Sequence, residues 1–173
     1  MNYQTRKFIN ELADNIRMAF HIETPILDMS EIVSRMQGNL IQTSHGVDIS
    51  SGFIRKKDDS FEIVVPFSQS EVRKNFTIAH ELGHLFLHMG YIIAPDIWQG
   101  QDNKEYHRYG ISEAESQANE FAAAFLMPQV EYKRVMEDNC QGNLVNTANI
   151  AKHFNVSIEA AANRGKWLGY LQW

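Results

Sequence analysis

The sequence of 173 residues contains a single cysteine, Cys140, and carries an acidic rather than a basic excess of charge. One thiol cannot form a disulfide within the chain or a zinc site made of several cysteines, so we interpret Cys140 as an inert thiol in a polar loop. The 16 lysines and arginines stand against 21 acidic residues, which gives a net charge of −5. This balance excludes a basic field that would attract nucleic acid or an acidic membrane surface.

Long apolar runs are also missing. The longest, residues 121–127, is too short to span a bilayer. Residues 1–11 carry charged and polar groups where a signal peptide needs an apolar stretch. With 44% hydrophobic and 21% charged residues, the composition is that of a globular protein with a core. We therefore expect a cytoplasmic protein without a membrane partner.

The sequence does contain the motif His80-Glu81-Leu82-Gly83-His84. On a helix, His80 and His84 lie one turn apart on nearly the same face, so their imidazoles can hold one zinc ion. Glu81 can take a proton from a water molecule bound to that zinc. This is the geometry of a zinc metallopeptidase, with two histidine ligands and a glutamate base. The alternative is a pair of histidines on an ordinary core helix.

The residues around the motif predict a buried helix. Residues 75–88 are apolar at most positions, with a helical period. Gly83 inside this helix costs about 1 kcal/mol of helix stability relative to alanine. A close approach of another backbone or of a ligand at this position would explain the glycine.

Periodicity along the rest of the chain predicts an α+β fold. We expect a zincin-like domain, with a small three-stranded sheet packed on the H-E-x-x-H helix and a helical C-terminal part. A single domain would cover residues 1–173, with an N-terminal helix in residues 1–24 and helix-turn-helix-like helices in residues 143–173 packed on it. The expected strands are 39–43, 52–56 and 60–66, the last two forming a hairpin, and the expected helices are 3–20, 28–36, 70–90, 112–127, 129–138, 147–154 and 157–167.

A catalytic zinc normally has three protein ligands and an open position for water. The second long helix offers Glu113, Glu115 and Glu120. At about 100° per residue, Glu120 and Gln117 fall on the same outward face as Glu113. Glu115 lies within the apolar stripe, where a carboxylate needs a cation or hydrogen-bond donors, so we predict that it is the third ligand. Alternatively, Glu115 forms a capping box with Ser112.

Two further residues are candidates for supporting the ligands rather than binding the metal. Asn119, one turn after Glu115, can hydrogen-bond a ligating histidine. His88 continues the histidine row, but its phase has drifted by about 80° from that of His80. We therefore predict that His88 supports the site or the core.

Two blocks of the sequence resemble the ImmA/IrrE-like metallopeptidases. They are FTIAHELGHLFLH at residues 76–88 and ESQANEFAAAFLMP at residues 115–128. The likeness extends over most of residues 25–170, and the paired blocks are far more specific than H-E-x-x-H alone.

The resemblance implies roles for individual residues. It implies that His80, His84 and Glu115 bind zinc. The catalytic base of the family carries over to Glu81. The second block of the family often has an acidic residue two positions after the ligand, where this chain has Gln117. Because Gln117 is predicted to face outward, we expect this difference to leave the site intact.

The resemblance also implies a substrate class. Members of the family commonly cleave a transcriptional repressor, so the chain would be a zinc-dependent endopeptidase acting on a repressor encoded nearby, of phage, mobile-element or stress-response type. The alternative from another class is a non-catalytic regulatory module that binds a repressor or DNA. Hydrolysis of a small amide is a third reading. Glu81, and the lack of an evident fourth ligand, favour the peptidase.

The oxyanion that develops during amide hydrolysis needs a donor beside the metal. Tyr106, His107 and Tyr109 are chemically suitable and belong to an irregular connection predicted over residues 91–111. Connections of this length are usually functional or mobile, and this one can cover the site. The strand at residues 61–65, if it forms a sheet edge, can bind an extended peptide by strand addition.

Residues 148–169 have the rhythm of a helix-turn-helix. A DNA reader needs basic and amide side chains on its second helix, and only Asn163, Arg164 and Lys166 are available there. Three alanines at positions 160–162 suit packing better than base reading. We therefore favour a helical pair packed on the catalytic domain over DNA binding.

Overall fold

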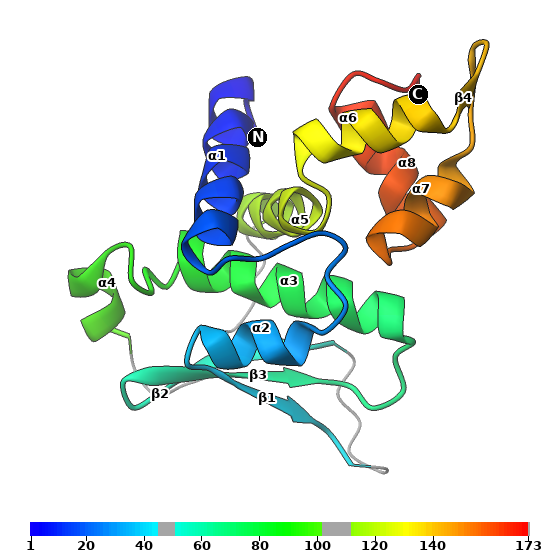
Figure 1. The fold of residues 1–173 in the computed structure, drawn as a ribbon. Helices are drawn as coiled ribbons and strands as arrows, with labels where there is room; N and C mark the ends of the chain where they lie inside the picture. The colour runs from blue at the N-terminus through cyan, green and yellow to red at the C-terminus, as the bar shows by residue number, and fades with distance from the viewer. Residues whose placement is uncertain (45–50, 102–111, 173) are drawn as a thin grey trace.

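The computed structural model describes residues 1–44, 51–101 and 112–172, and it has the predicted α+β architecture (Figure 1). A small sheet lies below α2 and α3, α5 crosses above α3, and α1 and α8 pack on α5. The helices are α1 (Tyr3–Ala19), α2 (Met29–Arg35), α3 (Glu71–Leu87), α4 (Pro95–Gln99), α5 (Ser112–Leu126), α6 (Gln129–Asp138), α7 (Thr147–Phe154) and α8 (Ile158–Trp167). The strands are β1 (Asn39–Gln42), β2 (Phe53–Lys57), β3 (Ser60–Val65), β4 (Cys140–Gln141) and β5 (Leu144–Val145).

Side-chain caps fix the starts of the first two helices. The Asn2 side chain accepts a hydrogen bond from the Thr5 amide at the start of α1. The Asp28 carboxylate accepts from the backbone amides of Ser30 and Glu31 at the start of α2. Such caps satisfy amides that have no partner within the helix, typically for about 1 kcal/mol each.

The three-stranded sheet has the order β1-β3-β2. β2 pairs with β3 as the predicted antiparallel hairpin, and β1 pairs with β3 in parallel. Peptide binding at residues 61–65 would require these residues to form a sheet edge, and this condition is not met, because β3 has a neighbour on both sides. Among the described strands, β1 and β2 form the two edges.

Helix α3 forms the middle layer between the sheet and α5. Its Ile78, Leu82 and Leu85 are buried in the same core as Ile54 and Ile63 of the sheet. On the other side, α3 contacts α5 closely at Gly83, where an added β-carbon would lie 2.9 Å from the Cα of Ala118. The glycine is explained by the approach of a neighbouring backbone, one of the two reasons expected from the sequence.

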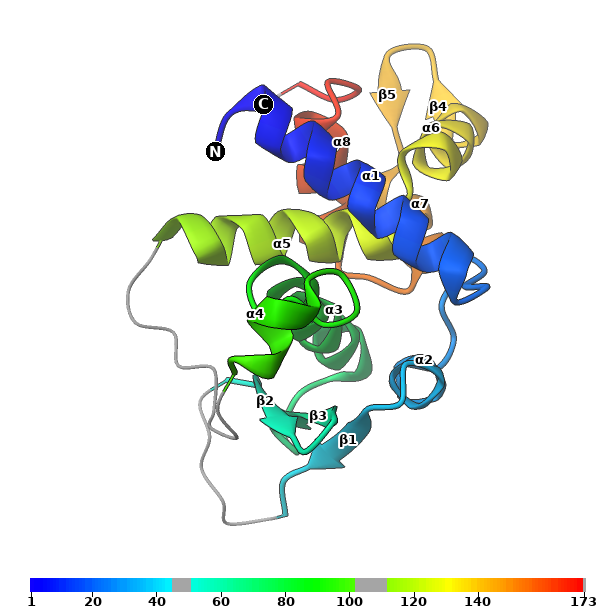
Figure 2. The same cartoon turned by 90° about the vertical axis from the view of Figure 1, so that its left-hand side faces the viewer.

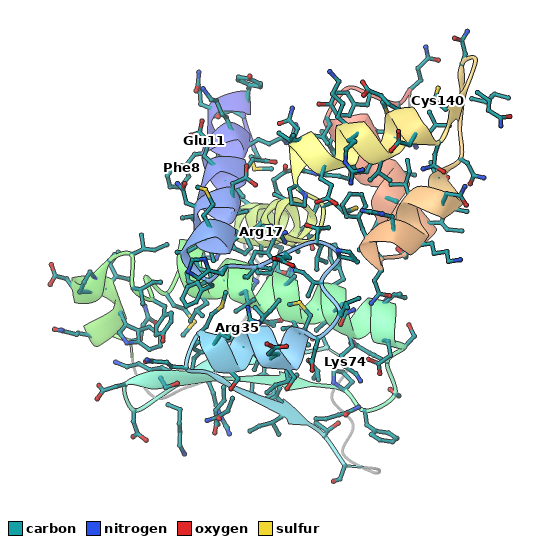
Figure 3. All side chains as sticks on the ribbon, in the orientation of Figure 1. Phe8, Glu11, Arg17, Arg35, Lys74 and Cys140 are labelled. Carbon is teal, nitrogen blue, oxygen red and sulfur yellow. The ribbon has the colours of Figure 1, made fainter. Side chains whose placement is uncertain are left out.

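Part of the connection predicted as irregular over residues 91–111 is helical. α4 begins at Pro95 and is tied to β2 by Lys56, whose Nζ donates to the carbonyl oxygens of Trp98 (2.9 Å) and Gln101 (3.3 Å). Residues 102–111 lie outside the described part of the chain. The C-terminal part also contains the unpredicted β4–β5 hairpin, which carries the exposed free thiol of Cys140 (Figure 3).

Glu120 was predicted to face outward, and the structure contradicts this prediction. Helix α5 is covered on both sides, so the face opposite α3 is also buried, and the Glu120 side chain is only 7% exposed. Its carboxylate contacts Arg164 of α8 (3.2 Å) and Arg6 of α1 (3.2 Å), and it accepts a hydrogen bond from Asn10 (2.7 Å). Glu120 therefore joins three helices that are far apart in the sequence.

Arg164 and Arg17 also link these helices, and together with Glu120 they form a buried polar cluster that we call the buried joint. Arg164 is 1% exposed, and it donates to the Met127 carbonyl oxygen (3.1 Å) and to Asn10 (2.7 Å). Burial lowers the pKa of its guanidinium, and the nearby Glu120 carboxylate partly restores it. Figure 3 shows Arg17 where α1 meets α5, and it donates to the Phe125 carbonyl oxygen (2.7 Å). Because Arg164 is buried, it is not available to contact DNA.

None of the helices in the described ranges combines the length and apolar character that a transmembrane segment requires.

Candidate metal centre

Three side chains from two helices converge on one point. The Nε2 atoms of His80 and His84 on α3 lie 3.1 Å apart. The Glu115 carboxylate of α5 spans both rings, with Oε2 3.3 Å from His80 Nε2 and Oε1 3.3 Å from His84 Nε2. Ligands at about 2.0–2.1 Å from a tetrahedral zinc ion are about 3.3 Å from one another. The measured separations match this spacing.

Burial differs among the three groups. The His84 side chain is 1% exposed and His80 is 9% exposed, whereas the Glu115 carboxylate is 33% exposed. The Glu115 carboxylate is therefore the most exposed of the three groups. A catalytic metal requires an open position for water, and a closed structural site does not.

Asn119 orients the first histidine. Its Oδ1 lies 2.9 Å from His80 Nδ1, and a carbonyl oxygen can only accept, so the ring donates from Nδ1. In the neutral ring, Nε2 then carries a lone pair directed at His84 and Glu115. This is the arrangement in which a histidine binds a metal through one nitrogen while the other is held by a neighbouring acceptor.

The second histidine contacts a further ring. His84 Nδ1 lies 3.0 Å from His88 Nδ1, and His88 Nε2 lies 3.1 Å from Gln117 Oε1. His88 thus stands behind His84, outside the converging cluster. The sequence prediction that Gln117 faces outward is wrong, because its long side chain reaches His88, which the helical phase of its Cα does not indicate.

The donor set fits a divalent cation of the zinc type. Two imidazole nitrogens and a carboxylate turn electron-rich atoms toward one another at about van der Waals distance or less, and a shared cation would offset their repulsion. Two histidines and one glutamate are ligands that zinc accepts in catalytic sites. Among the described residues, no other group of histidine, cysteine, aspartate or glutamate side chains is arranged in this way.

Glu81 lies beside His80 on α3 and is 1% exposed. A carboxylate this deeply buried requires hydrogen-bond donors or a nearby cation. The oxyanion candidates Tyr106, His107 and Tyr109 lie outside the described residues.

Comparisons with known proteins give a family match and a structural likeness. Residues 44–166 match the model of a peptidase family described as the IrrE N-terminal-like domain. No curated protein matches the chain significantly. Among solved structures, the chain is similar to a Mycobacterium tuberculosis transcriptional regulator, with a TM-score of 0.61 and 19% sequence identity over 93% of this chain and 50% of that one. The chain thus spans about half of that regulator's length, and the likeness shows a shared fold.

Proposed function

Because the chain belongs to the IrrE N-terminal-like family of peptidases, we propose that it is a zinc-dependent endopeptidase that acts on a regulatory protein. The observation that carries the proposal is the convergence of His80, His84 and Glu115 at the spacing of a tetrahedral zinc site, with Glu81 on the same helix turn. We also propose that the protein is located in the cytoplasm.

In this proposal His80, His84 and Glu115 hold the metal. Zinc bound there supplies the Lewis acidity that amide hydrolysis requires. The Glu81 carboxylate accepts a proton from the attacking water and returns it to the nitrogen of the leaving amine. Asn119 holds the His80 ring in the orientation that its contact with Oδ1 defines.

The proposed substrate is a transcriptional repressor, on the basis of the family resemblance. An extended segment of such a protein would lie along β2, because β2 is the edge strand on the side where α5 begins (Figure 2), and Glu115 belongs to the first turn of α5. In this proposal the peptide binds along β2 rather than along residues 61–65, because those residues belong to the central strand β3. The burial of Arg164 speaks against the alternative of a DNA-binding module.

The first test is the zinc content of the parent and of Glu115→Ala, measured after loosely bound ions have been removed. We expect about one zinc per chain in the parent and much less in the variant. A parent that binds no zinc at neutral pH, even when zinc is supplied, would overturn the proposal.

A second test separates catalysis from binding. Glu81→Gln keeps all three proposed ligands, so it should bind zinc like the parent but fail to cleave. Cleavage is followed by mass spectrometry on a library of extended peptides incubated with each protein. Equal cleavage by the parent and Glu81→Gln would exclude Glu81 as the base, and a parent that cleaves nothing while it binds a repressor would favour a regulatory module.

A further inference from the structure

Two residues of α5 interact with the two histidine ligands, one directly and the other through a third histidine. Asn119 contacts His80 directly, at 2.9 Å. Gln117 is separated from His84 by a second ring, since its Oε1 lies 3.1 Å from His88 Nε2 and His88 Nδ1 lies 3.0 Å from His84 Nδ1. The contacts form a continuous chain from Gln117 through His88 to His84.

Hydrogen-bond chemistry gives this chain a direction. The Gln117 carbonyl oxygen can only accept, so His88 donates to it from Nε2. A neutral imidazole with its proton on Nε2 has a lone pair on Nδ1. His88 Nδ1 therefore accepts from His84 Nδ1, and the lone pair of His84 is left on Nε2, the atom that faces His80 and Glu115.

The opposite direction is incompatible with a metal at the cluster. If the amide group of Gln117 were turned to donate, His88 would carry its proton on Nδ1 and would donate to His84 Nδ1. His84 would then have a proton on Nε2, pointed at the other two proposed ligands. A hydrogen-bond acceptor at position 117 is therefore required for His84 to direct the lone pair of its Nε2 atom toward the metal site.

We propose that Gln117 is a positioning residue that acts through His88 to hold His84 in the tautomer and ring orientation that binds zinc. The inference rests on the proposed function, since it concerns the same metal centre. The Gln117 side chain contacts His88, and in this proposal its effect on His84 passes through that ring.

The test compares zinc affinity, measured by competition with a coloured chelator, in the parent, Gln117→Met and Gln117→Glu. Methionine has a similar length but no strong acceptor, and glutamate retains one. We expect Gln117→Met to lower zinc affinity by about 10–100-fold, as is usual when the partner of a ligating histidine is lost. Gln117→Glu should retain most of the affinity. The matched control is Gln99→Met on the surface of α4, which should bind zinc like the parent.

A double variant tests whether the two residues act in series. His88→Leu alone should weaken zinc binding as Gln117→Met does, and the double variant should be no weaker than His88→Leu. The absorption bands of bound Co²⁺ provide a readout of ligand geometry, and they should shift in Gln117→Met but not in Gln99→Met. Thermal unfolding of the metal-free proteins checks that each variant is folded.

Three results would overturn the inference: parent-like zinc affinity in Gln117→Met, an equal loss in Gln117→Glu and Gln117→Met, or additive losses in the double variant. Each of these leaves the metal centre itself in place. A parent that fails to bind zinc would instead overturn the proposed function.

Discussion

The Cα of Ala118 lies 2.9 Å from the point at which a β-carbon on Gly83 would stand, and the Ala118 carbonyl oxygen lies 3.0 Å from it. The backbones of α3 and α5 therefore touch inside the H-E-x-x-H motif. Glu115 lies one turn before Ala118 on α5, so this contact helps to set the distance between the carboxylate and the two histidines.

Gly83→Ala should destabilise the protein even though alanine is the better helix former. The gain in helix propensity is about 1 kcal/mol, while overpacking at a rigid backbone contact typically costs about 1–3 kcal/mol. Zinc affinity should fall as well, because α5 must move away from α3. Urea unfolding and zinc titration measure both effects. Gly100→Ala is the control, since its β-carbon would meet neighbours only at 3.5 Å or more.

Glu120→Ala should lower the free energy of unfolding by about 3–5 kcal/mol, because it leaves Arg164 charged and buried without its carboxylate partner. The comparison is Glu113→Ala on the exposed side of α5, for which we expect less than about 0.5 kcal/mol. Urea unfolding of the metal-free proteins gives both values. Equal, small losses in the two variants would show that the buried joint contributes little to stability.

Tyr132 should make stability depend on pH above 10. Burial raises the pKa of its hydroxyl from 10.0 to about 12, against the lowering effect of Arg164. The unfolded chain thus loses this proton first, so the stabilisation is complete below pH 10 and is lost as the pH rises toward 12. By pH 12 the parent should lose about 2 kcal/mol relative to Tyr132→Phe.

At neutral pH the parent should be more stable than Tyr132→Phe. The Tyr132 hydroxyl donates to the Ala161 carbonyl oxygen at 2.6 Å, a contact worth about 1 kcal/mol. Tyr132→Phe should therefore be less stable than the parent at pH 7 and more stable near pH 12. Chemical unfolding at a series of pH values follows the difference, and a constant difference would show that the hydroxyl has the same pKa in the folded and unfolded chains.

Ile92→Gly should stabilise the protein, which is unusual for the loss of an isoleucine. Ile92 is 54% exposed and has a φ of 53°, a left-handed conformation that costs an ordinary residue about 1–2 kcal/mol. Glycine removes this strain and loses about 0.5–1 kcal/mol in chain entropy. The neighbouring Ile93, exposed but without a positive φ, is the control, and Ile93→Gly should be destabilising in the same thermal unfolding assay.

Removal of zinc should lower the stability of the parent. At a zinc concentration 100 times Kd, binding adds about 2.7 kcal/mol to the free energy of unfolding, and a chelator should abolish this gain. The stability of Glu115→Ala should neither rise when zinc is added nor fall when the chelator is added. Thermal unfolding with zinc and with excess chelator tests this, and a chelator effect of equal size in the variant would place the bound metal elsewhere.

Local signals in the sequence were sufficient for much of the fold. The helix that carries His80 is long and strongly periodic, and the strands at residues 52–56 and 60–66 lie close enough in the sequence to form a hairpin, so both features were predicted from their own residues. α4 was missed because five residues starting at Pro95 are too few to show a helical period.

Long-range packing accounts for the remaining errors. The phase of Glu120 correctly separates it from Glu115, but phase does not reveal that α1 and α8 cover the opposite face of α5. The central position of residues 61–65 depends on a parallel partner about 20 residues earlier, which no local pattern specifies. The contact between Gln117 and His88 likewise arises from two helices meeting.

The buried joint at Glu120 has a consequence for how relatives of this protein are compared. The stretch matched to the family ends at residue 166 and begins at residue 44, after α1. Yet Asn10, Arg6 and Arg17 of α1 satisfy charges and carbonyl groups inside that stretch, and Arg6 lies 4.1 Å above the ring of Trp167. The stretch that matches the family is therefore shorter than the stretch of chain that packs together, and a fragment cut to residues 44–166 would leave Glu120 without its contacts with Asn10 and Arg6.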